Sequence, residues 1–295
     1  MRIFKPSYYD EFKCIADKCK HNCCIGWEID VDEEKLVSYM TQYGEFGDRL
    51  RENISLEDEC PHFVLGEGER CPFLNENNLC DIIINMGEES LCQICSDHPR
   101  FVNCSDDREE IGLGLCCEEA ARLILTCESK VKIIGEKSEE DAVIFNMRDM
   151  VIEKLQQREK PIDERIEFVK EMFRIKLPQK QWDIEYLKLE RLDKTWSDRL
   201  MSLRGQGHEL KCDWSIAFEQ ILVYFVYRYM AQGQYDGRYN ERVLFAILSF
   251  FIIRELFKRS EETMEELVEI CRMYSSEVEY SEENVEALLT VLGKG

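Results

Sequence analysis

The second half of the chain has the hydrophobic pattern of a series of helices. From Glu118 onward, apolar residues recur at positions i, i+3, i+4 and i+7, which places them on one face of a helix. The run from Val243 to Ile253, interrupted by Ser249 alone, is too short to span a bilayer and predicts a buried central helix, so no transmembrane segment is expected. After the segment 118–127, helices are predicted at about 140–158, 163–177, 180–204, 213–233, 239–259, 262–275 and 281–292.

The first part of the chain is less regular. Residues 27–31 alternate apolar and acidic side chains, as a short strand does, and residues 32–40 begin with the acidic first turn of a helix. Between about 45 and 70 no period is clear, so we expect a loop with short helical pieces. Residues 71–80 are typical of a hairpin, because the Asn77-Asn78 pair tolerates the left-handed turn conformation.

The predicted fold class is therefore mainly α. An irregular cysteine-rich region with a few short strands, residues 1–127, is expected to pack on a C-terminal helical bundle, residues 128–295. The chain has 295 residues, of which 44% are hydrophobic, and this suffices for one large or two modest folded domains. Its net charge of −22 repels phosphate backbones, so we expect no nucleic-acid partner. A basic peptide or a lysine side chain suits such a surface, although acidity most often serves solubility alone.

Cysteines are concentrated in the first part of the chain. All fifteen except Cys212 and Cys271 lie between Cys14 and Cys127. The chain start lacks the apolar core of a secretory signal, so a reducing cytoplasmic location is expected, where disulfides are rare. Adjacent cysteines, as at 23–24 and 116–117, also cannot bridge to each other without strain. A metal is therefore the favoured interpretation and disulfides are the alternative.

The identity of the metal is open from the spacing alone. The Cys92-Gln-Ile-Cys95 motif is typical of zinc, whereas the looser N-terminal group suits an iron–sulfur cluster equally well. Cys127 lies on an apolar helix face and is predicted to belong to the core. A histidine at 21, 62 or 98 could replace a thiolate, although a hydrogen-bonded or exposed histidine is more common. The predicted ligands are Cys14, Cys19, Cys23, Cys24, Cys71, Cys80, Cys92, Cys95 and Cys116.

Four cysteine-containing segments, taken in their order along the chain, resemble the flagellin lysine-N-methylase family of bacteria (FliB type). The resemblance covers Cys14 to Asp30, Cys71-Pro-Phe-Leu to Cys80, Gly87 to Arg100 with Cys92, Cys95 and His98-Pro-Arg, and Leu115 to Leu123, and it continues weakly into residues 218–224. The sequence departs from the family pattern at His98, where the family favours Tyr, and at Cys117, where the family has Pro. A looser kinship is with the YkgJ-type cysteine-cluster proteins, which are described as zinc or iron chelators.

The resemblance implies a protein methyltransferase that depends on S-adenosylmethionine and carries a [4Fe-4S] cluster on its cysteines. Its expected substrate is an exposed lysine of a flagellin-like protein. No strand is followed by Gly-x-Gly-x-x-Gly, so a Rossmann-type cofactor site is not supported. An open iron of a cluster held by three thiolates could instead chelate the amino and carboxylate groups of the cosubstrate. A non-enzymatic zinc- or iron-binding module is the alternative function.

Methyl transfer to lysine requires removal of a proton, because the unperturbed pKa of the ammonium is about 10.4. A carboxylate or a tyrosinate can accept this proton, and Asp30, Glu219 and Tyr224 are the predicted catalytic residues. Trp27, within the first motif of the resemblance, and Arg100 are expected to contact the cosubstrate. Arg100 could bind its carboxylate with two parallel hydrogen bonds, and a simple salt bridge is the alternative.

Overall fold

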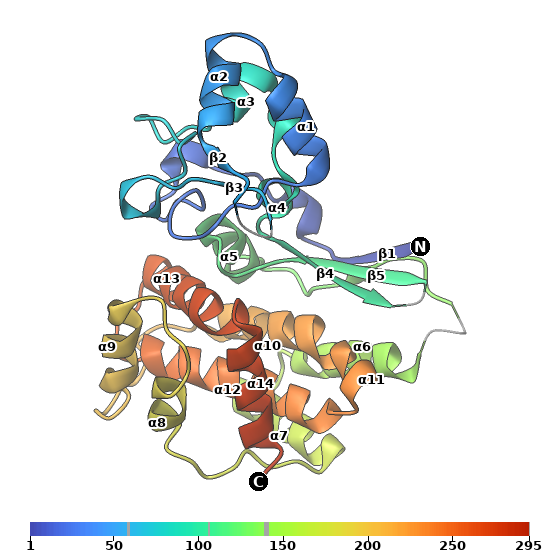
Figure 1. Cartoon of the computed structure of the whole chain (residues 1–295). Coiled ribbons are helices and arrows are strands. Elements are labelled where there is room, and N and C mark those ends of the chain that lie inside the picture. Colours follow the sequence, from blue (N-terminus) through green and yellow to red (C-terminus); the bar gives the residue numbers. More distant parts are fainter. Residues whose placement is uncertain (58–59, 106, 139–141, 295) are drawn as a thin grey trace. The chain divides into compact units, whose positions relative to one another are not determined.

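The computed structural model describes residues 1–57, 60–105, 107–138 and 142–294. The chain forms two compact units (Figure 1). The smaller unit is Lys13–Phe101, and the larger combines Met1–Phe12 with Val102–Gly295. The first twelve residues join the larger unit because they include a strand of its sheet. The division into domains 1–127 and 128–295 stays a prediction about which part of the chain has which function.

The smaller unit contains short helices joined by loops, drawn in blue to teal in Figure 1. The predicted helix at 32–40 is confirmed as α1, which Asp32 caps by accepting a hydrogen bond from the Lys35 amide at 3.1 Å. The elements are α1 (Glu33–Thr41), α2 (Gly44–Glu52), β2 (Ile54–Ser55), β3 (His62–Phe63), α3 (Asp81–Met86) and α4 (Gln93–Asp97).

Two details of the smaller unit differ from the prediction. α2 lies where a loop with short helical pieces was expected, and Arg51 ties it to the preceding turn by donating to the Gln42 carbonyl at 2.7 Å. The strand predicted at 27–31 is wrong. The chain makes only isolated antiparallel bridges there, from Ile25 to Arg70 and from Asp30 to His62, and between them Gly26 turns the backbone with a φ of +92°.

The larger unit contains a four-stranded sheet that the sequence did not predict. Its strand order is β4-β5-β1-β6, with β1 parallel to β5 and antiparallel to β6. Phe4 of β1 pairs in register with Glu110 of β5. The strands are β1 (Arg2–Pro6), β4 (Arg100–Ser105), β5 (Arg108–Leu113) and β6 (Ile133–Ile134).

The helices predicted for the second half of the chain are confirmed with one exception. They are α5 (Glu118–Leu125), α6 (Val143–Leu155), α7 (Ile162–Phe173), α8 (Trp182–Leu187), α9 (Lys194–Ser202), α10 (Ser215–Tyr229), α11 (Gly233–Asp236), α12 (Tyr239–Phe257), α13 (Met264–Tyr274) and α14 (Glu282–Leu292). A π-helical turn, Ser275–Glu279, continues α13. The predicted fold class, mainly α, is therefore confirmed.

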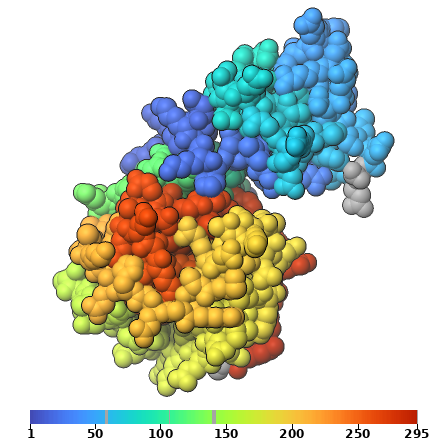
Figure 2. All heavy atoms as spheres, turned by 90° about the vertical axis from the view of Figure 1, so that its left-hand side faces the viewer, coloured from blue at the N-terminus to red at the C-terminus, as the bar shows by residue number. Residues whose placement is uncertain are grey.

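The exception is the single helix predicted at 180–204, which is two helices, α8 and α9. The chain breaks between them because its amides have other partners: the amides of Leu192 and Asp193 both donate to the Glu277 carboxylate at 2.8 Å. Asp193 then caps α9 by accepting from the Thr195 amide. Figure 2 shows this segment, in yellow, beside the red-orange residues of α13, and Trp196 contacts the Tyr274 ring there.

The core of the larger unit lies around α10 and α12, which pack against each other. The predicted buried central helix is confirmed, since α12 is buried on nearly every side from Arg242 to Ile253. Edge-to-face ring contacts join it to α10, such as Phe225 to Phe245. Within the described ranges, no helix combines the length and the apolar character that a bilayer crossing requires.

A buried ion cluster joins β5 to α6. Glu110 is 1% exposed and accepts hydrogen bonds from Arg108, at 2.9 and 2.5 Å, and from Arg148. The Arg108 guanidinium also lies 3.5 Å from the centre of the Phe4 ring. Charges removed from water so completely are stable only while they remain paired.

We expect Glu110→Gln to destabilise the protein strongly, because it removes the buried negative charge that two buried guanidinium groups share. Arg148 keeps a second carboxylate partner, Asp149. The loss should be about 3 to 5 kcal/mol in the free energy of unfolding, measured by urea denaturation. Glu109→Gln is the matched control: it is the same substitution one residue earlier, on the other face of β5, and should change stability by about 0.5 kcal/mol or less. Equal losses of stability in the two variants would contradict a stabilising role of the buried ion pairs at Glu110.

Candidate functional site

Every cysteine is present as a thiol in the structure. Eight of the nine predicted ligands lie in the smaller unit, and Cys116 lies in the larger one. Five of these eight lie in or against one small core, and a sixth, the exposed Cys23, is hydrogen-bonded to one of the five, Cys24. The six thiols are Cys23, Cys24, Cys71, Cys80, Cys92 and Cys95.

Two loops distant in sequence bring the first of these thiols together. The Cys71 amide donates to the Cys24 carbonyl at 2.9 Å, and the Gly26 amide donates to the Glu69 carbonyl at 3.1 Å. With the bridge between Ile25 and Arg70, these bonds align the two loops side by side. The adjacent cysteines 23 and 24 therefore lie next to Cys71.

The predicted turn between Cys71 and Cys80 is confirmed. Asn78 adopts the left-handed conformation with a φ of +57°, and the Asn75 side chain accepts from the amides of residues 77 and 79 at 2.9 and 3.1 Å. The backbone of Leu74 then bridges to that of Cys80, so the second thiol returns toward the first.

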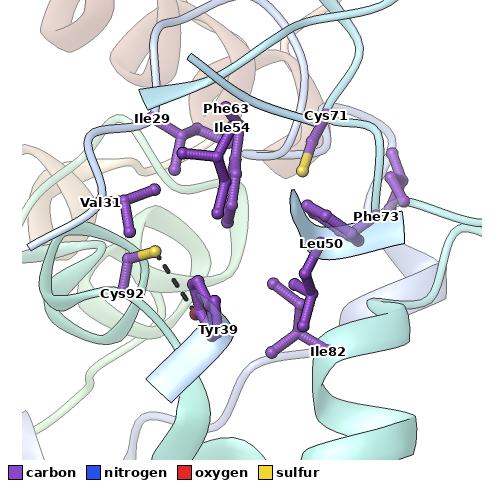
Figure 3. Close-up of a cluster of buried hydrophobic side chains, with 11 residues drawn as sticks. Ile29, Val31, Tyr39, Leu50, Ile54, Phe63, Cys71, Phe73, Ile82 and Cys92 are labelled. Carbon is purple, nitrogen blue, oxygen red and sulfur yellow. Dashed lines mark hydrogen bonds between the residues drawn. The ribbon is translucent and has the colours of Figure 1, made fainter. Parts of the chain in front are cut away.

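Cys92 and Cys95 are positioned by the start of α4. Cys92 precedes its first residue, and Asp32 fixes this helix start by accepting from the Gln93 amide at 2.8 Å while it also caps α1. The Tyr39 hydroxyl lies 3.5 Å from the Cys92 sulfur, as the dashed line in Figure 3 shows. The helix ends at Asp97, so that His98 is extended directly before Pro99.

An apolar cluster lies among the six thiols. Figure 3 shows Cys71 near Phe73 and Cys92 beside Val31 and Tyr39. The Phe63 and Phe73 rings within the cluster are 4.8 Å apart. Cys92 is fully buried and Cys71 is 6% exposed. Cys24, Cys80 and Cys95 are partly buried and pack against the same cluster. The thiols thus border a dry core on one side.

The thiols influence one another's ionisation. A hydrogen bond from Cys24 lowers the pKa of Cys23, and one from Cys95 lowers the pKa of Cys92. Their partners are affected oppositely, because these hydrogen bonds and burial raise the pKa values of Cys24 and Cys95. Burial raises the pKa of Cys71 to about 11. The charges of Cys23 and Cys71 also act on the Cys95 thiol, which shows that the thiols share one electrostatic environment.

The six thiols have the right chemistry to bind a thiophilic metal, but their positions in the structure suit a metal ion only partly. Thiolates are preferred ligands of zinc and of iron–sulfur clusters. Within the described part of the chain, however, no three His, Cys, Asp or Glu side chains are close enough together to hold a metal ion. Metal binding would therefore require the two hydrogen-bonded thiol pairs to turn toward each other and to release their protons.

The remaining predicted ligands have different surroundings. Cys14 is exposed, and its sulfur accepts from the Ala16 amide at 3.4 Å, while Cys19 is half-buried. Cys116, in the larger unit, donates to the Tyr280 hydroxyl at 3.0 Å. Cys127, predicted to be core, is only half-buried, because its sulfur turns to the Ser129 carbonyl at the end of α5.

The three predicted catalytic residues are held very differently. Asp30 is exposed in the smaller unit. Glu219 is fully buried in α10 and is paired with Arg158 at 2.8 Å and Arg165 at 2.7 Å. Tyr224, on the same helix, is 1% exposed, and burial raises its pKa well above 10. Glu219 and Tyr224 thus have separate sets of partners, although they lie on one helix.

Tyr224 belongs to a buried polar network that the sequence analysis missed. Its hydroxyl donates to the Glu279 carboxylate at 3.0 Å and accepts from Arg228 at 2.6 Å and from the Leu115 amide at 3.4 Å. Tyr229 donates to the same carboxylate at 3.0 Å. The network holds the loop before Cys116 against α10. The signal that could have revealed it is Arg228, the single charge in the otherwise apolar and aromatic run of residues 221–229.

The two residues predicted to contact the cosubstrate lie near the thiols in sequence. The Trp27 indole donates to the Cys23 carbonyl, and its ring lies 5.6 Å from that of His98. Arg100 is exposed and donates to the Ser96 carbonyl at 3.2 Å. His98 itself is largely buried, and within the described residues its Nδ1 atom has no hydrogen-bond partner.

The architecture defines a class: a mainly helical protein with a small, thiol-rich second unit. Residues 167–295, just under half of the chain, match the C-terminal domain of FliB lysine N-methylase. The predicted resemblance to the FliB-type lysine N-methylase family is therefore confirmed for this part of the chain. The kinship with YkgJ-type proteins stays a prediction.

Curated relatives are consistent with this family. The flagellar biosynthetic protein FliU of Salmonella muenchen is 26% identical over 144 residues, which are 46% of this chain and 83% of that protein. Lysine-N-methylases of Salmonella typhimurium and Salmonella choleraesuis are each 26% identical over 132 residues, 42% of this chain. The match spans only 32% of the length of these two enzymes. No solved structure matches the chain.

We expect the stability of the smaller unit to depend on pH through His98. Burial, and secondarily the charge of Arg100, lowers its pKa to about 4 from the usual 6.5. The unfolded chain therefore binds a proton between pH 6.5 and 4 that the folded chain rejects, so stability should decrease as the pH falls through this window. The titration of His98 should lower the free energy of unfolding by about 2 to 3 kcal/mol between pH 7 and pH 4.5. Urea unfolding at the two pH values measures this loss.

His98→Gln should reduce that pH dependence, whereas His21→Gln, at an exposed position, should leave it unchanged. Carboxylates that titrate below pH 5 affect all three proteins alike, so the comparison isolates the histidine. An undiminished loss of stability at pH 4.5 in the His98 variant would show that this ring is not the group responsible.

Proposed function

We propose that the chain is a protein-lysine N-methyltransferase that uses S-adenosylmethionine and carries a [4Fe-4S] cluster on its cysteines. The observation that supports the enzyme class is the match of residues 167–295 to the C-terminal domain of a lysine N-methylase. The names of the Salmonella relatives, which are flagellar or methylase names, support a protein substrate of the flagellin kind.

The gathering of six thiols supports the metal centre. Five of them border one core, and the sixth, Cys23, is hydrogen-bonded to Cys24. A cluster or a zinc ion would replace the protons of these thiols with metal. Cys14, Cys19 and Cys116 remain further candidate ligands. When bound, an iron–sulfur cluster with one open iron would supply a positive centre for the amino and carboxylate groups of the cosubstrate.

The reaction itself is an in-line displacement. The neutral lysine nitrogen forms a bond to the methyl carbon, the bond from that carbon to the sulfonium sulfur breaks, and the sulfur retains the electron pair as a thioether. The ammonium proton must leave the lysine before this attack. A dry surrounding favours the neutral amine, because burial disfavours charge, and the apolar cluster beside the thiols offers such a surrounding.

The environments of the predicted proton acceptors favour Asp30. Two guanidinium groups already bind the Glu219 carboxylate, which is fully buried, so a substrate lysine cannot reach it. Burial opposes ionisation of Tyr224, so a tyrosinate is costly there. Asp30 is an exposed carboxylate of the smaller unit, in the same unit as the six thiols, and a substrate can reach it.

The charge of the chain favours a basic substrate surface. A net charge of −22 attracts lysine-rich segments at long range and increases the association rate at low ionic strength. An exposed lysine on a flagellin-like protein is the partner that we propose. A cytoplasmic location and the absence of a nucleic-acid partner remain predictions from the sequence.

We expect anaerobically purified protein to be brown and to absorb near about 400 nm, as iron–sulfur proteins do. Cys80→Ser and Cys95→Ser should reduce the bound iron, because both thiols border the core and are only partly buried, so that folding tolerates the change. Cys212→Ser is the matched control, because this exposed thiol lies in the larger unit and should leave the iron content unchanged. Iron and sulfide analysis measures the effect.

Transfer of a labelled methyl group from S-adenosylmethionine to purified flagellin then tests the enzyme, with and without the cluster. Activity should be lost together with the iron. A colourless protein that contains zinc and transfers no methyl group would instead favour a non-enzymatic metal-binding module.

A further inference from the structure

A surface hollow of the smaller unit lies beside the thiols and has no role in the description above. It has a volume of about 350 Å³ and lies between the loop after Cys24 and the loop around β3. Its lining includes Trp27, Glu28, His62, Val64, Leu65 and Glu69. Apolar and acidic side chains thus share one depression.

The apolar part of the hollow suits an alkyl chain. The Trp27 ring is half-buried and forms part of the wall, while Val64 is 49% exposed and Leu65 is half-buried. Aromatic faces attract cations, and aliphatic side chains pack along methylene groups. A lysine side chain has both parts, because four methylene groups carry its ammonium.

The acidic part is formed by Glu28 and Glu69. Gly68 and Glu69 both adopt left-handed backbone conformations, with φ values of +67° and +57°, and this turn directs Glu69 toward Gly26. A Cβ atom at Gly26 would lie 3.9 Å from the Glu69 Oε2 atom, so the carboxylate stands beside that bare backbone. Within the described ranges Glu69 has no cationic partner, and Glu28 approaches only His62, at 3.6 Å.

The hollow and the thiols share the same two loops. Trp27 donates to the Cys23 carbonyl, and the Gly26 amide donates to the Glu69 carbonyl next to the Cys24–Cys71 pairing. A cation held by Glu69 therefore lies beside the loops that carry Cys23, Cys24 and Cys71. A substrate lysine bound there would be close to these thiols, and it would still have to lose its proton before methyl transfer.

We propose that this hollow binds the side chain of the substrate lysine, with its methylene groups along Trp27, Val64 and Leu65 and its ammonium at Glu69. This inference rests on the proposed function, because it assigns the substrate site of that reaction. The sulfonium of S-adenosylmethionine is also a cation on an alkyl chain. The experiment must therefore distinguish binding of a lysine side chain from binding of S-adenosylmethionine in this hollow.

The experiment measures binding and needs no turnover. Nα-acetyl-lysine methylamide is titrated into the full chain while the indole N–H signal of Trp27 is followed by NMR, assigned by its loss in Trp27→Phe. The matched probes are the Nε-acetylated compound, which is neutral, and S-adenosylmethionine. The lysine compound should shift the signal, and the neutral compound should bind at least about five-fold more weakly, because loss of an ion pair of about 1 kcal/mol reduces affinity by this factor.

Glu69→Gln should weaken binding of the lysine compound by about five-fold. Glu67→Gln is the matched control: it is the same change, two residues earlier, at an exposed position outside the lining, and it should leave binding unchanged. Equal binding of the charged and the neutral compound, equal effects of the two variants, or a response of Trp27 to S-adenosylmethionine alone would each overturn the proposal.

A methyl-transfer assay with flagellin separates this inference from the proposed function. If the lysine compound binds as expected but no methyl group is transferred, the proposed enzyme fails and the cation site stands. If methyl transfer occurs and Glu69→Gln has the KM of Glu67→Gln, the enzyme stands and the site fails. A higher KM in the Glu69 variant, with kcat nearly unchanged, supports both.

Discussion

The backbone pairing of the Cys24 and Cys71 loops is the constraint on which the smaller unit depends. A single amide-to-carbonyl bond of 2.9 Å, with its neighbours, aligns segments that lie far apart in the sequence. A unit of this size buries little apolar surface, so fixed backbone contacts must hold its loops. The same pairing gathers the thiols, forms one wall of the hollow and carries Trp27. Structure and proposed chemistry thus rest on one set of hydrogen bonds.

The larger unit is stabilised in a different way. Its core around α10 and α12 is dense and aromatic, and its buried charges are paired, as in the cluster around Glu110 and in the pairing of Glu219 with two arginines. Pairs of this kind fix geometry more than they add stability. The two arginines give Glu219 a structural role on α10, and its catalytic role stays a prediction.

The helices could be predicted because their apolar spacing is regular over many residues, as on α12. The sheet could not, because Arg108 and Glu110 of β5 are charged and therefore suggest surface positions. Both are buried, since the rings of Phe4 and Phe145 lie against Arg108 and Arg148 pairs with Glu110. The Asn77-Asn78 pair indicated the Cys71–Cys80 turn. The approach of Cys24 to Cys71 depends on long-range pairing, which no local pattern encodes. The network at Glu279 likewise depends on a helical irregularity.

That irregularity, the π-helical turn at Ser275–Glu279, has a consequence for evolution by insertion and deletion. The turn places one carboxylate, Glu277, on the amides before α9 and another, Glu279, on Tyr224 and Tyr229. Removing one residue there would restore a regular helix and rotate everything that follows by about 100°. Both carboxylates would then lose their partners at once. This stretch should therefore keep its length even where its side chains vary.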